Sequence, residues 1–275
     1  MKPSKSYSSQ SQNPNKDLVN SWQQSLLLGS LGVLLLLVGW HISAQQLGEL
    51  IMATPAQAFE AMLHLLADDS AQAHLWLSVQ RMLQGILLGC GLGFLLGLVA
   101  GFYAWVRFLL APLRWILMSV PPVVLVVLAM LWFGLGSQMV VFIASVLLAP
   151  GIYINTEKAV RMIDPKLLEM ARVYRLSTLQ RLFNLYIPAI AAPLTAAMLI
   201  ALCNGVRIVV LAEVLGSEQG IGYALSAARS NFDSQELYGW VLIILSLVAV
   251  MEWLVLQPLQ HYLTRWQKEP AYAAA

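Results

Sequence analysis

The chain has 275 residues, of which 59% are hydrophobic and 11% are charged, and its mean hydropathy is +0.71. Soluble domains carry roughly 25% charged residues, so this composition excludes an ordinary water-soluble protein and predicts a bundle of membrane-spanning helices. The net charge of +2 is too small to indicate nucleic-acid binding. The two cysteines, Cys90 and Cys203, both lie in apolar runs, which is typical of small buried residues and not of a disulfide or a metal site.

Six apolar runs are long enough to cross about 30 Å of hydrocarbon. They cover residues 24–42, 82–106, 112–135, 138–156, 188–213 and 238–260. Residues 1–23 are rich in Ser, Gln and Asn, a composition that does not fold alone, so we expect a disordered cytoplasmic segment there. The fold class is therefore predicted to be an all-α polytopic membrane protein, with a transmembrane domain over residues 24–265 and a cytoplasmic tail over 266–275.

The basic residues are distributed asymmetrically along the chain. Thirteen of the sixteen lie before the first run, between the second run and the first turn of the third, in the connection after the fourth run, or after the sixth run. The alternate connections contain mostly acidic residues, namely Glu49, Glu60, Asp68, Asp69, Glu218, Asp233 and Glu236. Because cytoplasmic loops carry the excess of Lys and Arg, both termini are predicted to lie in the cytoplasm.

The first outward connection, residues 43–78, contains a helix signal of its own. Thr54 and Pro55 are typical of an N-cap and a first helical position. An apolar stripe follows at helical spacing, formed by Ala58, Phe59, Met62, Leu65 and Leu66. This pattern predicts an amphipathic helix on the outer face, which either contacts an external partner or packs on its own bundle.

The second run carries a glycine at every fourth position, namely Gly85, Gly89, Gly93, Gly97 and Gly101. In lipid, such a row forms a groove that lets another helix backbone approach closely. The row therefore predicts a helix-packing surface. Its partner is either another helix of the same chain or a second copy.

The third run contains Pro121 and Pro122, which remove two backbone donors and are expected to bend or break the helix. Carbonyl groups freed at membrane depth must face protein or a water-lined cavity. Both prolines are therefore candidates for a solute pathway, although bent helices also occur for packing alone.

Three ionisable residues, Arg207, Glu213 and Glu252, lie within the fifth and sixth runs. A charge at bilayer depth costs at least about 2.5–3.5 kcal/mol, so each is a functional candidate, and Arg207 and Glu213 are candidates for the solute pathway. Asn204 and Arg207 are three residues apart on one helix face and can offer donors to an anion. The alternative is that Arg207 pairs with an acidic group of another run and that the two glutamates reach toward the membrane edge.

The longest cytoplasmic connection, residues 157–187, is predicted to form an elbow of two short helices. Asp164 and Pro165 are typical of the start of the first helix, and Ser177 with Gln180 forms a capping box at the start of the second. The first helix mixes small, apolar and charged side chains. Such an elbow either docks on a soluble partner or rests on lipid headgroups.

These segments resemble the membrane-spanning permease subunits of ATP-binding-cassette importers. Glu169-Met170-Ala171, followed by Pro188 nineteen positions after Glu169, is similar to the coupling loop of that family. Other segments resemble its nitrate, sulfonate and taurine branch, and these are Leu131-Trp132-Phe133-Gly134-Leu135-Gly136, Asn155-Thr156, Asp164-Pro165, Ala212-Glu213 and Gly220-Ile221-Gly222-Tyr223. The similarity extends from about residue 50 to residue 265.

The resemblance implies an ATPase-coupling element between the fourth and fifth spans. Its residues would be Glu169, Met170, Ala171, Arg172, Arg175 and Pro188. The family usually has glycine where this chain has Arg175, at a bend that often needs a positive φ, and a non-glycine residue there costs roughly 1 kcal/mol. Met170 replaces the usual alanine and makes a bulkier surface.

The resemblance also implies the partners: a second copy of the chain, two ATP-binding-cassette ATPase subunits, and a periplasmic or surface solute-binding protein, in a bacterial inner membrane. The chain contains no Gly-x-x-x-x-Gly-Lys-Ser/Thr phosphate loop, its four histidines lack metal-ligand spacing, and no nucleophile and base are paired. We therefore predict no enzyme activity, no metal and no cofactor on this chain, with ATP and Mg²⁺ bound by the ATPase.

The solute implied by the resemblance is small and anionic, such as nitrate, a sulfonate or taurine. Bicarbonate and thiamine-precursor pyrimidines are alternatives within the same family. Outside the family, the alternative is a self-sufficient channel or secondary carrier, which would not depend on ATP.

Overall fold

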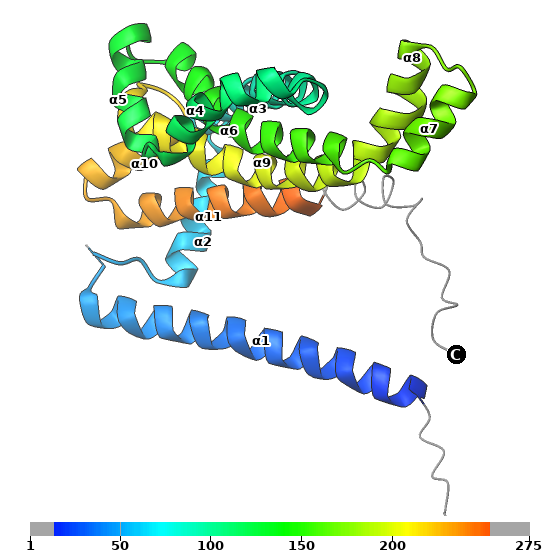
Figure 1. Cartoon of the computed structure of the whole chain (residues 1–275). Coiled ribbons are helices and arrows are strands. Elements are labelled where there is room, and N and C mark those ends of the chain that lie inside the picture. Colours follow the sequence, from blue (N-terminus) through cyan, green and yellow to red (C-terminus); the bar gives the residue numbers. More distant parts are fainter. Residues whose placement is uncertain (1–13, 50, 254–275) are drawn as a thin grey trace, which may run out of the picture. The chain divides into compact units, whose positions relative to one another are not determined.

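The computed structural model describes residues 14–49 and 51–253, and every regular element within these ranges is a helix (Figure 1). The all-α class predicted from the sequence is confirmed. The chain divides into two compact units, Met1–Gln57 and Ala58–Ala275. The end of the expected sixth span and the tail over 266–275 lie outside the described residues.

The first unit contains α1 (Pro14–Leu47), whose segment Leu28–Leu47 is long and apolar enough to cross a membrane. The helix begins ahead of the expected span, so residues 14–23, for which we expected no structure, are helical. The Trp40 indole of α1 donates a hydrogen bond to the Ala53 carbonyl at 2.9 Å. The Thr54 backbone N–H donates to Gln57 Oε1 at 2.9 Å, which completes the N-cap that Thr54 and Pro55 predicted.

The second unit holds the remaining helices. The longer ones are α2 (Pro55–Ala67, which starts at the end of the first unit), α3 (Asp69–Phe102), α4 (Ala104–Ser119), α5 (Pro122–Phe133), α6 (Ser137–Arg161), α9 (Ile187–Gly216), α10 (Ile221–Ser230) and α11 (Ser234–Met251). The elbow between α6 and α9 contains α7 (Pro165–Val173), α8 (Thr178–Arg181) and a π-helical turn, Leu182–Tyr186. Together with α1, the helices α3, α6, α9 and α11 are five candidate spans, and the bent pair α4 and α5 makes six.

α3 starts well before the expected boundary at residue 82. Asp68 caps it by accepting a hydrogen bond from the Ala71 N–H at 3.2 Å. The Ser70 hydroxyl and this N–H stabilise the carboxylate and lower the pKa of Asp68. A helix of 34 residues is roughly 51 Å long, so α3 extends beyond the hydrocarbon and includes part of the predicted outward connection.

The third span is broken where Pro121 and Pro122 occur. α4 and α5 meet there at an angle of 103°. Val120 and Pro121 both have extended backbone angles, with ψ of 128° and 136°, and α5 restarts with Pro122 in its first turn. The break follows from the missing N–H of two successive prolines, because neither can donate to the preceding helical turn.

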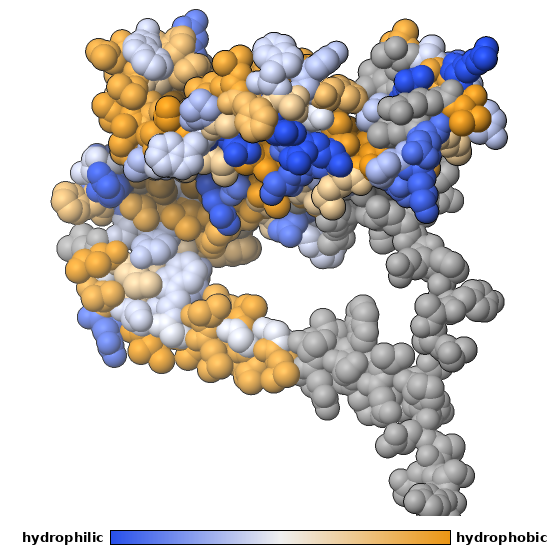
Figure 2. All heavy atoms as spheres, viewed as in Figure 1, coloured by the Kyte–Doolittle hydropathy of each residue, from blue (hydrophilic) through white to orange (hydrophobic). Residues whose placement is uncertain are grey.

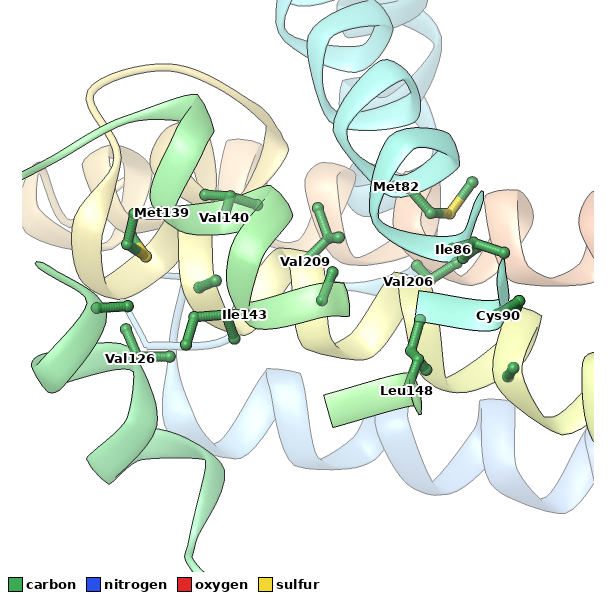
Figure 3. Packing of buried hydrophobic residues seen from close by; sticks show 14 of the residues in the cluster. Met82, Ile86, Cys90, Val126, Met139, Val140, Ile143, Leu148, Val206 and Val209 are labelled. Atoms are coloured by element: carbon green, nitrogen blue, oxygen red, sulfur yellow. The ribbon is translucent and has the colours of Figure 1, made fainter. Parts of the chain in front are cut away.

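The main core lies between α3, α5, α6 and α9 (Figure 3). Buried side chains from all four helices meet in it, among them Met82, Ile86, Val126, Met139, Ile143, Leu148, Val206 and Val209. Several of the other buried positions in this cluster are alanines, which let the helix backbones come close and gain dispersion contacts where lipid supplies little hydrophobic driving force.

The glycine row of α3 packs against α6 of the same chain. A Cβ atom added at Gly89 would lie 2.7 Å from the Ser145 carbonyl oxygen, and one at Gly93 would lie 2.5 Å from the Ala149 carbonyl oxygen. Added Cβ atoms at Gly85, Gly97 and Gly101 would meet Ala144, Tyr153 and Val160 in the same way. The row therefore joins two helices within one chain, and its groove is filled without a second copy.

α2 packs on its own bundle with one side of its apolar stripe. Met62 and Leu65 contact a buried cluster that includes Ile221 of α10 and Trp240 of α11. Phe59, in contrast, is 54% exposed. Of the two alternatives for this helix, packing on the bundle accounts for the inner residues and leaves Phe59 on the surface.

Candidate functional site

Two cavities lie one after the other along the interface of α6 and α9; we name them together the trough, and its upper part is the cavity that contains Arg207. Its upper part is a cavity of about 300 Å³ whose polar lining comes from Asn155, Asn204 and Arg207. Gly151 and Ala201 are among its other lining residues, and their small side chains leave room between the two helices. The sequence-predicted pair Asn204 and Arg207 thus lines one cavity, together with an asparagine from the facing helix.

The lower part of the trough is a second cavity of about 420 Å³, which shares Asn155 with the first. Lys158 of α6 and Pro193 of α9 line it, and it reaches Asp164 at the start of the elbow. From Arg207 to Ala189, which lines the lower cavity, α9 extends roughly 27 Å at 1.5 Å per residue. The trough is therefore nearly as long as the hydrocarbon is thick.

The trough is electropositive. Within the described residues, the side chains of Arg207 and Lys158 take part in no hydrogen bond or ion pair, while the Asn155 amide donates to the Gly151 carbonyl at 2.8 Å. The pairing of Arg207 with an acid of another span, which was the alternative from the sequence, is not present among these residues. Two unpaired cations and two amides form a surface that attracts and hydrogen-bonds an anion.

The elbow forms through the two predicted caps. The Lys166 N–H donates to Asp164 Oδ1 at 2.9 Å at the start of α7. At the start of α8, the Ser177 N–H donates to Gln180 Oε1 at 2.9 Å and the Gln180 N–H donates to Ser177 Oγ at 3.3 Å. This reciprocal pair is the capping box expected from the sequence.

Between its helices, the elbow turns at Arg175, whose φ is 50°. This is the left-handed conformation that the family's glycine would adopt without strain, so Arg175 accepts roughly 1 kcal/mol of backbone strain. The Leu176 N–H donates to the Ala171 carbonyl at 3.1 Å and closes the turn. The chain therefore keeps the bend without the glycine.

The surface of the elbow mixes apolar and charged residues, which Figure 2 shows at the end of the molecule where α7 and α8 lie. Glu169 and Met170 are exposed, and Val173 is 79% exposed. Pro188 is exposed in the first turn of α9. Arg172 lies on α7 between these residues.

Ala171 differs from the other residues of the predicted coupling element. It is 1% exposed, so it packs inside the elbow and does not present its side chain to a partner. The expectation that Ala171 forms part of the contact surface is corrected accordingly. Among the described side chains of the elbow, the exposed apolar ones are those of Leu167, Met170, Val173, Tyr174, Leu179 and Phe183.

Glu213 is a structural residue and does not line the trough. It is fully buried, and Arg81 Nη1 of α3 lies 2.7 Å from its carboxylate. The Ser78 hydroxyl donates to the same carboxylate at 2.7 Å, and the Gly222 N–H donates to it at 3.0 Å. The pathway role expected for Glu213 is thereby corrected, because a paired carboxylate enclosed by α3, α9 and α10 is unavailable to a solute.

The same cluster explains the Gly220-Ile221-Gly222 segment. Gly220 has φ of 110°, and a Cβ atom there would collide with the Glu213 carboxylate. The Ile221 N–H donates to Ser78 Oγ at 2.8 Å, and Arg81 Nη1 donates to the Gln219 carbonyl at 2.7 Å. The cluster therefore fastens the start of α10 to α3 and to the end of α9.

A second buried carboxylate, Glu157, lies near the C-terminal end of α6. It is 3% exposed and is held by Arg161 at 3.0 Å and Arg107 at 3.7 Å. The pair with Arg107 joins the start of α4 to α6. This leaves Lys158, the next residue, as the cation that faces the lower cavity.

Sequence reasoning missed Arg81, Ser78, Glu157 and Lys158. A signal existed for the ion pair of Arg81 with Glu213, since these two residues are lone opposite charges near the outer ends of their spans. No sequence signal distinguishes Lys158 from the other cytoplasmic cations.

The remaining pathway candidates, Pro121 and Pro122, are exposed at the break between α4 and α5. Glu252 is exposed at the end of α11.

Residues 92–267 match the family model described as "Binding-protein-dependent transport system inner membrane component". The aliphatic sulfonates transport permease protein SsuC of Escherichia coli is 31% identical, over 86% of this chain and 86% of the relative. The SsuC protein of Bacillus subtilis is 28% identical over 79% and 78% of the two chains. The taurine transport system permease protein TauC of Escherichia coli is 24% identical over 90% and 92%.

The fold is similar to that of a solved chain of the MetNI methionine ABC transporter in an inward facing conformation. The TM-score is 0.58 with 20% sequence identity, over 74% of this chain and 98% of that chain. This likeness concerns the fold alone. The family match over residues 92–267 and the 31% identity to SsuC of Escherichia coli show that the chain belongs to the family of inner-membrane components of binding-protein-dependent transport systems, the ABC transporter permeases.

Proposed function

We propose that this chain is the permease subunit of an ATP-driven importer for a small anionic solute, and that the trough between α6 and α9 is part of the solute path. The observation that carries the proposal is Arg207, which has no ion-pair partner among the described residues and lines a cavity of about 300 Å³ with two asparagines. A cation held at membrane depth is costly unless something offsets it, and an anionic solute does so during passage.

The names of the relatives support a sulfonate as the anion. Three of them are described as transport permeases for aliphatic sulfonates or for taurine, which also carries a sulfonate group. Arg207 supplies the charge, and the amides of Asn155 and Asn204 supply neutral donors for the remaining oxygens. Nitrate and bicarbonate would use the same donors, whereas a neutral pyrimidine would not need the cation.

The proposed assembly contains a second copy of this chain, two ATPase subunits that bind ATP and Mg²⁺, and an external solute-binding protein. It lies in the bacterial inner membrane with both termini in the cytoplasm, as the distribution of basic residues predicts. Membership in a binding-protein-dependent family disfavours the alternative of a self-sufficient channel or carrier.

The proposed mechanism follows from the connection between the elbow and the trough. The elbow joins the end of α6 to the start of α9, and these are the two helices that line the trough. When the ATPase subunits close on ATP, they displace the elbow and shift the two helices relative to each other. The break at Pro121 and Pro122 lets α4 and α5 follow this shift as separate segments.

Replacing Arg207 with glutamine is expected to lower the rate of anion import at least tenfold. The substitution keeps a polar side chain and removes the charge that offsets the anion, and tenfold corresponds to about 1.4 kcal/mol. The measurement is uptake of labelled taurine, or of the sulfonate that the cognate binding protein carries, into proteoliposomes containing the complete transporter. Arg207→Lys, the matched control, keeps the charge and should retain most of the import. Equal import by the Gln variant and the wild type would contradict an anion path at Arg207.

Replacing Val173 with aspartate is expected to release the ATPase subunits from the complex. Val173 is 79% exposed in the apolar part of the elbow, and a charge there would have to be desolvated on docking. The measurement is the amount of ATPase that co-purifies with the tagged permease. Phe59→Asp introduces the same charge at an exposed apolar residue of α2 and should leave co-purification unchanged. An intact complex with Val173→Asp would show that the ATPase does not dock on this surface.

A further inference from the structure

The trough contains two cations, and only the upper one was apparent from the sequence. Arg207 lines the upper cavity with Asn204, and Lys158 lines the lower cavity with Asp164 and Pro193. Asn155 belongs to both cavities, so it lies at the passage between them. Each cavity therefore has one cation without a partner in the described part of the chain, and they share one amide.

The separation of these cations can be estimated along α6. The upper cavity reaches Leu148 on α6, and Lys158 is ten residues further on, which corresponds to roughly 15 Å. Roughly 15 Å is too far for one small anion to contact both cations at once, so the two cations attract it as separate sites and not as one chelating pair.

We infer that the trough holds an anion at two successive stations, Arg207 with Asn204 and then Lys158 with Asn155, and that Lys158 is the exit station from which the anion leaves toward the cytoplasm. The inference rests on the proposed function and adds Lys158 to it. A single strong site would bind the anion at the cost of releasing it slowly. Two moderate sites of the same charge let the anion leave the first by moving to the second.

The lower mouth of the trough favours release. Asp164 lines the lower cavity beside Lys158, and its carboxylate already caps α7 by accepting the Lys166 N–H. The negative charge of Asp164 weakens the attraction of Lys158 for an anion at the mouth. Glu157 does not cancel the charge of Lys158 directly, because it is buried against Arg107 and Arg161.

The test measures the local electrostatic potential at each station, and it does not require the natural solute to be known. In a Cys203→Ser background, in which the remaining native cysteine, Cys90, is buried, a cysteine replaces Leu147 in the upper cavity or Ala189 in the lower cavity. The probes are an anionic sulfonate-bearing thiosulfonate reagent and its cationic trimethylammonium analogue, applied to the full chain in proteoliposomes. The readout is the ratio of the two reaction rates.

Lys158→Gln is expected to lower the anion-to-cation rate ratio roughly three- to tenfold at Ala189→Cys and to change it little at Leu147→Cys, which lies roughly 16 Å from Lys158 along α6. Arg207→Gln is expected to show the reverse pattern. Lys158→Arg, the matched control, should keep the wild-type ratio at both positions. An unchanged ratio at Ala189→Cys in Lys158→Gln would overturn the exit station.

Import by the complete transporter separates failure of the exit station from failure of the proposed function. If both hold, Lys158→Gln and Arg207→Gln each reduce taurine or sulfonate import, while the amount of co-purified ATPase remains unchanged. If import falls only in Arg207→Gln, the exit station is wrong and the anion path remains. If neither variant affects import, the anion path through the trough is wrong, and the proposed function of the trough fails with it. Loss of the ATPase from Lys158→Gln would assign Lys158 to docking and overturn the inference.

Discussion

Replacing Glu213 with glutamine is expected to lower the free energy of unfolding by about 3–5 kcal/mol, because it leaves the Arg81 guanidinium buried without its carboxylate. Arg81 is 3% exposed, so water cannot take over the role of the lost charge. The amide is nearly the same size as the carboxylate, and the loss is therefore electrostatic and not a cavity effect. Denaturant unfolding of the detergent-solubilised chain, followed by tryptophan fluorescence, measures it.

Glu218→Gln is the matched control for this variant. Glu218 is exposed five residues further along the chain, and the same substitution there should change stability by less than about 0.5 kcal/mol. The double variant Arg81→Met with Glu213→Leu should lose less than the sum of its single variants, since it removes both charges together. A Glu213→Gln variant as stable as Glu218→Gln would show that the pair contributes nothing to the fold.

Replacing Gly93 with alanine is expected to destabilise the chain by about 1–3 kcal/mol through overpacking. The new Cβ atom would lie 2.5 Å from the Ala149 carbonyl oxygen and 3.0 Å from Ile152 Cβ. A backbone carbonyl cannot rotate away as a flexible side chain does, so α3 and α6 must separate. Combining Gly93→Ala with Gly89→Ala should increase the loss, because the two contacts lie on the same interface.

Gly91 provides the control within the same helix. A Cβ atom at Gly91 would have no neighbour within 4 Å, and alanine is favoured over glycine in a helix interior by up to about 1 kcal/mol. Gly91→Ala should therefore be neutral or slightly stabilising under the same unfolding assay. If the two variants behaved alike, the glycine row would not be the contact surface between α3 and α6.

The local features of the elbow were predictable because they depend on residues close in the sequence. The caps at Asp164 and at Ser177 with Gln180 use side chains and backbone groups three or fewer residues apart. The positive φ at Arg175 was expected from the glycine that the similar family has at this position, and not from Arg175 itself. The burial of Ala171 was not predictable in this way, because it depends on how α7 folds back on the chain.

Residues far apart in the sequence were harder to assign. Glu213 was identified as costly, but its partner Arg81 lies 132 positions away, and only the packing of α3 against α9 and α10 joins them. Arg207 presented the same signal in the sequence and has a different outcome, because its face of α9 opens on the trough. Two ionisable residues of the same helix thus have different roles: Glu213 belongs to a buried structural ion pair, and Arg207 belongs to a candidate anion site.

The sequence by itself determined the all-α membrane fold, the expected spans, the break at Pro121 and Pro122, and the caps, because hydropathy, proline and capping act over a few residues. Only the tertiary structure decided which helix fills the glycine groove, which charges are paired, and that Asn155 and Lys158 join Arg207 along one trough. These outcomes depend on the rotation of each helix about its axis, and that rotation is fixed by packing between distant segments.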